Sequence, residues 1–335
     1  MVSKKMMKFR CLVCLVAILT GTMVCYADSQ FFAPVTGTAD DILTDYSFWS
    51  YDVSGNQVVG WANGSLQLLD KSGKLISNFG TPTGYSGYNS FTTIDPSGNS
   101  VWVGFTTNGD DRIYQVDYAT GAWTHKATLA SNFDMEFYGG NAYVSGLNST
   151  DWSAPTSIWL LDTSGSDNHD KLVEMSGNSA GLAFDSAGNA YYASYSGSDS
   201  TLYKWDAADI AGAIGAGYLT YDDGTKLSDL ELGAYDTDVD DADNIIFNGN
   251  GSYSYTAIWN GTAGDGINYD YLGIGCGTYG DWFTMIDSQG DVTTESGYLY
   301  QTDCYYYGIA AAQVPEPATI ALLGLGGLLL RRRRG

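Results

Sequence analysis

Length, composition and charge exclude several classes of protein at the outset. The chain has 335 residues, and 38 acidic against 15 basic side chains give it a formal net charge of −23. A surface this acidic repels nucleic acid and anionic lipid, so we expect no nucleic-acid partner. The chain has two histidines, His125 and His169, and their spacing does not match a metal-binding pair.

The N-terminal residues predict a secretory signal peptide over residues 1–27. Basic residues precede an apolar run over residues 11–24, and small residues at the −3 and −1 positions precede a cleavage site after Ala27. The apolar run is too short to span a bilayer comfortably, which disfavours a permanent anchor. We therefore expect signal peptidase to release residues 28–313 as an exported domain, followed by a separate C-terminal segment over 314–335.

A short turn recurs six times in the exported domain. The clearest copy is Asp95-Pro96-Ser97-Gly98-Asn99, in which proline presets one backbone angle and Gly and Asn tolerate a positive φ. The copies lie at 51–56, 94–99, 136–141, 184–189, 239–244 and 286–291. The third copy lacks the Asp, and the fifth has Asp in place of Gly. A second strand follows each turn, and a third strand then ends in Asp70, Asp117, Asp162, Asp206, Asn260 or Asp303.

This repeat predicts an all-β protein of the β-propeller class. A repeat of about 40 to 55 residues with about four strands is typical of a propeller blade. Six turns indicate six blades, with five or seven as the alternatives. Residues 207–214 interrupt the strand pattern, and we expect one or two helical turns there.

Residues 181–193, with the sequence GLAFDSAGNAYYA, resemble a repeat of the NHL type, which is also seen in gluconolactonase-like propellers. The resemblance implies the fold and leaves the activity open. An enzyme of that kind would use acidic residues with a divalent metal, drawn from several blades.

The best candidate for metal binding is the acidic stretch around Asp236, Asp238 and Asp240. Hard oxygen ligands at alternate positions suit Ca²⁺, and neighbouring carboxylates repel one another unless a cation is bound. The alternative is that Asp240 is the turn residue of its repeat and its neighbours are solvated. Only Cys276 and Cys304 remain after removal of the signal peptide, and two cysteines of an exported protein could form a disulfide.

The C-terminal segment is the most specific feature of the sequence. Pro315-Glu316-Pro317 precedes an apolar stretch over 318–330 and a cluster of four arginines, Arg331, Arg332, Arg333 and Arg334. This combination is similar to the PEP-CTERM sorting signal. The resemblance implies that the apolar stretch forms a short transmembrane helix that inserts transiently into the inner membrane. It also implies that an exosortase recognises the proline motif and removes the segment. An ordinary C-terminal anchor, the alternative, would share every feature except the proline motif.

These features together predict a binding or structural propeller that is secreted or sorted to the cell surface. The PEP-CTERM resemblance associates the protein with exopolysaccharide and the extracellular matrix. We expect no catalytic residues, because no recognisable triad is present. The rival hypothesis is a gluconolactonase-like or glycan-cleaving enzyme.

Overall fold

The structure is a computed structural model that describes the chain between residues 48 and 313. Gaps in this range fall at 56, 71, 108, 152, 178–179, 195–199, 232–233, 241, 250–254, 275–291, 296–297 and 303–308. All described residues belong to one compact unit, Ser29–Gln313. The predicted signal peptide, the C-terminal sorting segment, Cys276 and Cys304 lie outside the described residues, so the expectations for them stay predictions.

The described residues form five four-stranded antiparallel sheets and one three-stranded sheet. The first contains β1 (Phe48–Ser54), β2 (Gln57–Ala62), β3 (Ser65–Asp70) and β4 (Leu75–Gly80). The second contains β5 (Tyr88–Ile94), β6 (Ser100–Thr106), β7 (Arg112–Asp117) and β8 (Trp123–Thr128). The third contains β9 (Asp134–Tyr138), β10 (Asn141–Leu147), β11 (Thr156–Leu161) and β12 (His169–Met175). The fourth contains β13 (Leu182–Phe184), β14 (Ala190–Ala193), β15 (Thr201–Trp205) and β16 (Thr225–Asp229). The fifth contains β17 (Ala234–Val239), β18 (Ile245–Gly249), β19 (Tyr255–Trp259) and β20 (Tyr269–Ile274). The last contains β21 (Val292–Glu295), β22 (Tyr298–Thr302) and β23 (Ile309–Gln313).

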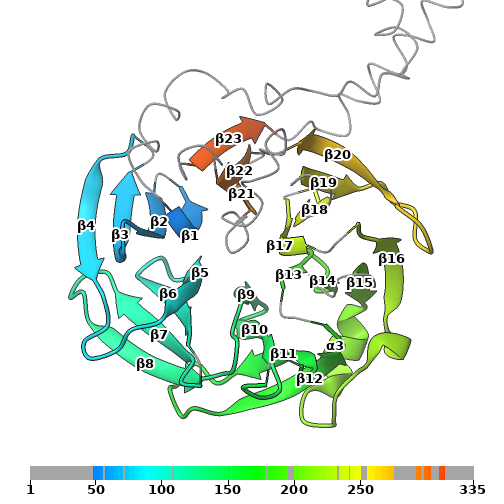
Figure 1. The fold of residues 1–335 in the computed structure, drawn as a ribbon, viewed down its shortest axis with the longest axis horizontal. Helices are drawn as coiled ribbons and strands as arrows, with labels where there is room; N and C mark the ends of the chain where they lie inside the picture. The colour runs from blue at the N-terminus through cyan, green and yellow to red at the C-terminus, as the bar shows by residue number, and fades with distance from the viewer. Residues whose placement is uncertain are drawn as a thin grey trace, which may run out of the picture. The chain divides into compact units, whose positions relative to one another are not determined.

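The sheets follow one another around a common centre, as Figure 1 shows. In the five four-stranded sheets the first strand lies innermost and the fourth outermost. Each innermost strand contacts the innermost strand of the next sheet, and β21 contacts both β17 and β1. The predicted β-propeller is therefore confirmed. Five blades are complete among the described residues, and the sixth repeat supplies the three-stranded sheet.

The recurring Asp of the repeat builds the turn between the first and second strands. Asp185 Oδ1 accepts hydrogen bonds from the backbone amides two and four residues on, at 3.0 and 2.8 Å, and its Oδ2 accepts one from Asn189 Nδ2 at 2.6 Å. Asp240 repeats this pattern with Asn244, at 2.9, 2.8 and 2.8 Å. These bonds satisfy the amide groups that a tight turn leaves unpaired. The repeated Asp and Asn are therefore explained by turn geometry.

The polar residue that ends the third strand has the same role in the next turn. Asp70 Oδ1 accepts the backbone amides of Ser72 and Lys74 at 2.9 and 3.0 Å. Asp117 Oδ1 accepts the amide and hydroxyl of Thr120 at 2.8 and 2.7 Å. Asp70 and Asp117, like Asp185 and Asp240, thus shape loops at the ends of the blades, whereas Asp52 of the first turn copy lies within β1.

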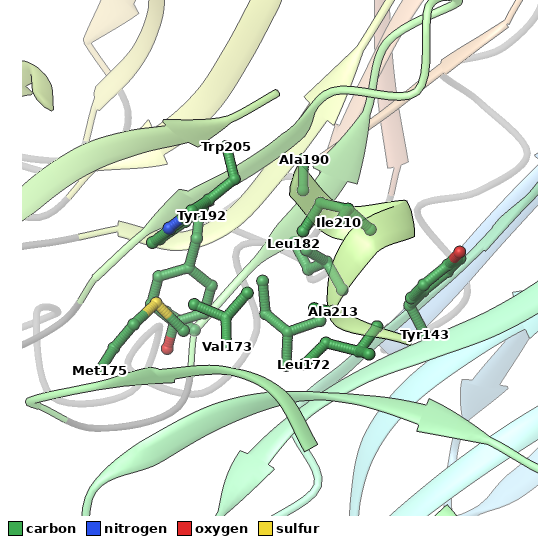
Figure 2. Packing of buried hydrophobic residues seen from close by; sticks show 12 residues of the cluster. Tyr143, Leu172, Val173, Met175, Leu182, Ala190, Tyr192, Trp205, Ile210 and Ala213 are labelled. Carbon is green, nitrogen blue, oxygen red and sulfur yellow. The ribbon is translucent and has the colours of Figure 1, made fainter. Parts of the chain in front are cut away.

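Apolar side chains fill the space between neighbouring blades. Figure 2 shows the cluster between the third and fourth blades, where Val173 and Met175 of β12 pack with Tyr192 and Trp205. All four side chains are buried. Full burial of a large apolar side chain contributes about 1.5–3 kcal/mol, so such clusters hold adjacent blades together.

An insertion between β15 and β16 covers the outer edge of the third blade. It contains α3 (Ala207–Ala213), which confirms the predicted helical turns, and the 3₁₀ helix η3 (Tyr221–Asp223). Leu219, between the two helices, forms a parallel bridge with Val173 of β12. Its amide donates to Leu172 O and its carbonyl accepts from the Glu174 amide, both at 2.8 Å. The insertion therefore pairs backbone groups that would otherwise be open on an edge strand.

Candidate functional site

The candidate site is a group of acidic side chains on three innermost strands, which we call the acidic centre. Its members are Asp52 on β1, Asp134 and Glu136 on β9, and Asp236 and Asp238 on β17. Residues two apart on a strand share a face. Asp134 and Glu136 therefore lie on one side of β9, and Asp236 and Asp238 lie on one side of β17. The carboxylates of Asp134, Asp238, Asp52 and Asp236 all act electrostatically on Glu136. Side chains far apart in the sequence therefore meet inside the ring.

Two members of the acidic centre also connect neighbouring blades. Asp52 Oδ1 accepts the amide of the next residue at 2.6 Å, and its Oδ2 accepts the Ile94 amide in the second blade at 2.7 Å. Asp134 Oδ1 accepts the next amide at 2.7 Å, and its Oδ2 accepts the Leu182 amide in the fourth blade at 2.6 Å. Each of these two aspartates thus connects its own innermost strand to the innermost strand of the next blade and aligns the two strands.

The environment of the acidic centre favours protonated carboxyl groups. Burial, with a further contribution from the Asp52 charge, raises the pKa of Asp134 to about 7, although its backbone hydrogen bonds act in the opposite direction. Burial and the four neighbouring carboxylates raise the pKa of Glu136 well above its ordinary value. Strongly perturbed acids that gather in one place are a recurring mark of functional sites, although structural networks show them too. The centre can therefore retain protons, or attract a cation, near neutral pH.

The three aspartates that the sequence suggested as calcium ligands all accept hydrogen bonds from the backbone. Asp240 uses both carboxylate oxygens in its turn. Asp236 and Asp238 lie on β17, and the Oδ1 atom of each accepts the amide of the following residue, at 2.8 and 2.7 Å. Within the described part of the chain, no group of three or more His, Cys, Asp or Glu side chains is placed to hold a metal ion. The calcium site at these residues stays a prediction.

Sequence reasoning did not identify Asp134 and Glu136. Glu136 is the first residue of the turn copy at 136–141, a position that is apolar or aromatic in the other five copies, so the repeat gave no acidic signal there. One signal could have identified them. Residues 134–136 and 236–238 both carry acidic residues at alternate positions of a predicted innermost strand. Only the closure of the ring brings these positions together.

The backbones of neighbouring blades approach closely beside the acidic centre. A Cβ atom on Gly181 would lie 2.2 Å from Thr237 N and 2.5 Å from Asp236 Cα. Real Cβ atoms do not come this close to backbone atoms, so only glycine fits at this position. The amide of the next residue, Leu182, is the one that Asp134 accepts. Gly181 thus lets β13 fit between β9 and β17.

A separate hollow of about 550 Å³ lies at one end of the third blade. It is lined by 140–142, 160–163 and 168–170. His169, one of the two histidines of the chain, begins β12. Its buried Nδ1 has no hydrogen-bond partner. Asp162, also in the lining, accepts hydrogen bonds from Ser164 and Ser166. The hollow offers no group of perturbed acids comparable to the acidic centre.

The fold is similar to that of several solved enzymes. A PQQ-bound aldose sugar dehydrogenase from Streptomyces coelicolor gives a TM-score of 0.55 at 14% identity, covering 83% of this chain and 96% of that chain. A gluconolactonase from Xanthomonas campestris gives 0.55 at 12% identity, covering 82% and 88%. A luciferin-regenerating enzyme gives 0.50 at 13% identity, covering 79% and 89%. At these identities the likeness shows the fold alone. No curated protein matches the chain in sequence.

A family model for the PEP-CTERM protein-sorting motif matches residues 313–334. This match confirms the resemblance seen at Pro315-Glu316-Pro317 and the arginine cluster. In the part of the chain that the structure describes, no helix is long and apolar enough to cross a membrane. The motif implies export, sorting to the cell surface and processing by an exosortase. The chain is therefore a β-propeller protein, similar in fold to these enzymes, that carries a PEP-CTERM sorting motif at residues 313–334.

Proposed function

We propose that this protein is an exported binding or structural propeller associated with the exopolysaccharide of the extracellular matrix. The observation that carries the proposal is the sorting motif at residues 313–334, which implies delivery to the cell surface. Signal peptidase would release residues 28–335 from the signal peptide. An exosortase would then act at Pro315-Glu316-Pro317 while the apolar stretch is transiently inserted in the inner membrane. The propeller would remain outside the cell.

The chemistry of the acidic centre supports binding or structure more than catalysis. Asp52 and Asp134 use their carboxylate oxygens to connect blades, which is a structural role. The two histidines lie on the strands β8 and β12, far out in their blades, and neither belongs to the acidic centre. Catalysis in the acidic centre would therefore depend on its carboxyl groups, and an activity assay tests for it.

Retention on matrix polysaccharide tests the proposal. Polysaccharide purified from the matrix of the producing cells is immobilised, and processed wild-type protein is passed over it at about 0.15 M salt, where long-range charge effects are screened. We expect retention of the wild type and none of an unrelated protein of similar net charge. Passage of the wild type without retention would overturn the association with exopolysaccharide.

The second candidate is an enzyme, and the raised pKa values of Asp134 and Glu136 favour it. A carboxyl group that stays protonated near neutral pH can act as a general acid. We expect no turnover of lactones, sialosides or acidic polysaccharides, with or without Ca²⁺. Turnover by the wild type that is lost in Glu136→Gln would establish the enzyme instead.

A further inference from the structure

The last strand of the propeller ends where the sorting motif begins. β23 pairs with β22 along its whole length, from Ile309 opposite Thr302 to Gln313 opposite Tyr298. The compact unit that contains all described residues also ends at Gln313. The family model for the sorting motif matches from residue 313 onward. The folded domain and the sorting motif therefore meet at a single residue.

A short stretch of chain separates β23 from the apolar stretch that the resemblance places in the membrane. Val314 alone lies between Gln313 and Pro315-Glu316-Pro317, and the apolar stretch starts directly after the motif, at Ala318. The residues 314–317 span at most about 14 Å when fully extended. The motif is therefore confined between a folded strand and the segment that would insert into the membrane.

An enzyme that cuts at the motif has to bind this part of the chain in an extended form. Main-chain hydrogen bonds supply much of the affinity for an extended segment. Pro315 and Pro317 have no N–H group to donate, so further donors must come from the residues before the motif. The nearest of these, Ala312 and Gln313, belong to β23, whose backbone is paired with β22. A cleft that encloses these residues must displace β22.

The folded domain would also obstruct a cleft that reads only the motif. Because Gln313 pairs with Tyr298, the neighbouring strand lies about 4.8 Å from the last residue of β23. The bulk of the blade thus begins two residues before Pro315. Release of Ile309–Gln313 from β22 would add up to about 17 Å of extended chain between the blade and the motif.

The position of β23 and its amino-acid composition suit a strand that can detach. It is the end strand of the three-stranded sheet and lies on the outer side of β22 (Figure 1). Its sequence is IAAAQ, and alanine is depleted in strands. The outermost strands β12, β16 and β20 bury larger side chains, including Val173, Leu227 and Tyr269. Three consecutive alanines can bury far less apolar surface, and segments with little buried apolar surface open locally.

We infer that β23 restrains processing, because it must detach from β22 before an exosortase can act at Pro315-Glu316-Pro317. This inference rests on the proposed processing by an exosortase and adds the structural step that controls it. When one state of a protein is competent to bind, the apparent affinity falls in proportion to the population of that state. Any bond that holds β23 on β22 therefore slows removal of the sorting segment.

A reversible cross-link between β22 and β23 tests the restraint. Gln301 on β22 lies opposite Ala310 on β23. The Cα atoms of directly opposite residues in antiparallel strands are about 4.5–5.5 Å apart, which is within the range that a disulfide spans. The lock variant Gln301→Cys/Ala310→Cys is therefore made in full-length protein that also carries Cys276→Ser and Cys304→Ser, so that the new cysteines pair only with each other.

The rate of processing is measured on the lock variant in two forms. Full-length protein is purified in detergent from cells that lack the enzyme, and it is either oxidised or reduced and alkylated before membranes that contain the enzyme are added. Loss of Arg331–Arg334 is then followed by intact-mass measurement. We expect the oxidised form to be processed at least about tenfold more slowly than the reduced form, because its competent state is depleted.

Two matched variants separate access to the chain from other effects of a disulfide. Gln115 on β7 lies opposite Thr124 on β8, so Gln115→Cys/Thr124→Cys in the same background places an equivalent cross-link in the second blade. This variant should be processed at one rate in both forms. A flexible insertion of about eight Gly and Ser residues after Gln313 in the oxidised lock variant should restore processing, because it supplies extended chain outside β23.

The outcomes distinguish this inference from the proposed function. Equal rates for the oxidised and reduced lock variant would overturn the restraint and leave processing by an exosortase intact. An oxidised lock variant that stays slow with the insertion would do the same. If the disulfide does not form, the insertion in the wild type decides, since it should speed processing and an unchanged rate would overturn the restraint. Wild-type protein that keeps its arginines would overturn both.

Discussion

Raising the pH from 5 to 8 should destabilise the folded protein, because the closely spaced and partly buried carboxyl groups of the acidic centre must then ionise. The pKa of Asp134 lies at about 7 instead of its ordinary 3.8, chiefly through burial. Below pH 3.8 the group is protonated in both the folded and the unfolded states, so it does not change the free energy of unfolding. Between about pH 4 and 7 the folded state holds a proton that the unfolded state has released, so the free energy of unfolding falls as pH rises.

The size of this effect follows from the shift. A difference of about three pH units corresponds to about 4 kcal/mol at 1.36 kcal/mol per unit, which is an upper value for this one group. Glu136 adds to it, because its pKa is raised by burial and by four carboxylates. Only the part of this shift that lies above pH 5, about two pH units or about 2.7 kcal/mol, is lost between pH 5 and pH 8. For a domain of this size, 1 kcal/mol shifts Tm by about 2 °C, so we expect Asp134 to lower Tm by about 5 °C over this range.

The turn carboxylates act in a different pH range. Hydrogen bonds from hydroxyl groups and backbone amides lower the pKa of Asp70, Asp117 and Asp162. Their contribution to stability is present above the ordinary pKa and is lost only as pH falls below it. Stability should therefore be greatest near pH 4 to 5, between the two ranges.

Thermal melts of the wild type and two variants provide the assay. Glu136→Gln removes a charge from the acidic centre and leaves the backbone pairing of β9 with β10 unchanged, so it should raise Tm at pH 8 and reduce the pH dependence. Asp222→Asn removes one exposed charge on η3 and controls for the general repulsion in so acidic a domain. A Tm that is constant from pH 5 to 8, or an equal gain at pH 8 in both variants, would refute the reasoning.

Two further predictions concern the backbone approach beside the acidic centre and the calcium hypothesis. Gly181→Ala should lower the free energy of unfolding by about 1–3 kcal/mol, because its Cβ would overpack against Thr237. The control Gly212→Ala, in open space on α3, should be neutral or stabilising by up to about 1 kcal/mol. Equal melting temperatures of the two variants would contradict this prediction. Calcium bound at Asp236, Asp238 and Asp240 in the folded state would add about 2.7 kcal/mol at a hundredfold excess over Kd. Melts with calcium and with chelator measure the shift, and a shift that survives replacement of all three by Asn would remove this site.

The fold could be predicted from the sequence because its repeat is local. The turn at Asp185 is built by Asn189 and by amides within four residues, so the residues that define the blade are close in sequence. The helix at 207–213 was visible for the same reason, since it interrupts the strand pattern. These elements can be predicted without knowing which residues pack against them.

The candidate sites depend on contacts that close the ring, and no local pattern encodes them. Asp134 matters because its carboxylate reaches Leu182 in the next blade, and Glu136 because charges from β1 and β17 surround it. The proposed restraint at β23 likewise depends on its pairing with β22. Strand alternation alone does not reveal which strands pair.

Intact-mass measurement of the surface-released protein tests most directly whether this propeller is sorted as proposed. A sorting signal and a plain anchor both need the apolar stretch and the arginines, but only a processing enzyme reads Pro315-Glu316-Pro317. Wild-type protein should therefore lack Arg331–Arg334, whereas a variant with alanine at all three motif positions should stay in the membrane with its arginines attached. Surface protein that still ends at Gly335, or normal release of the triple variant, would contradict the account.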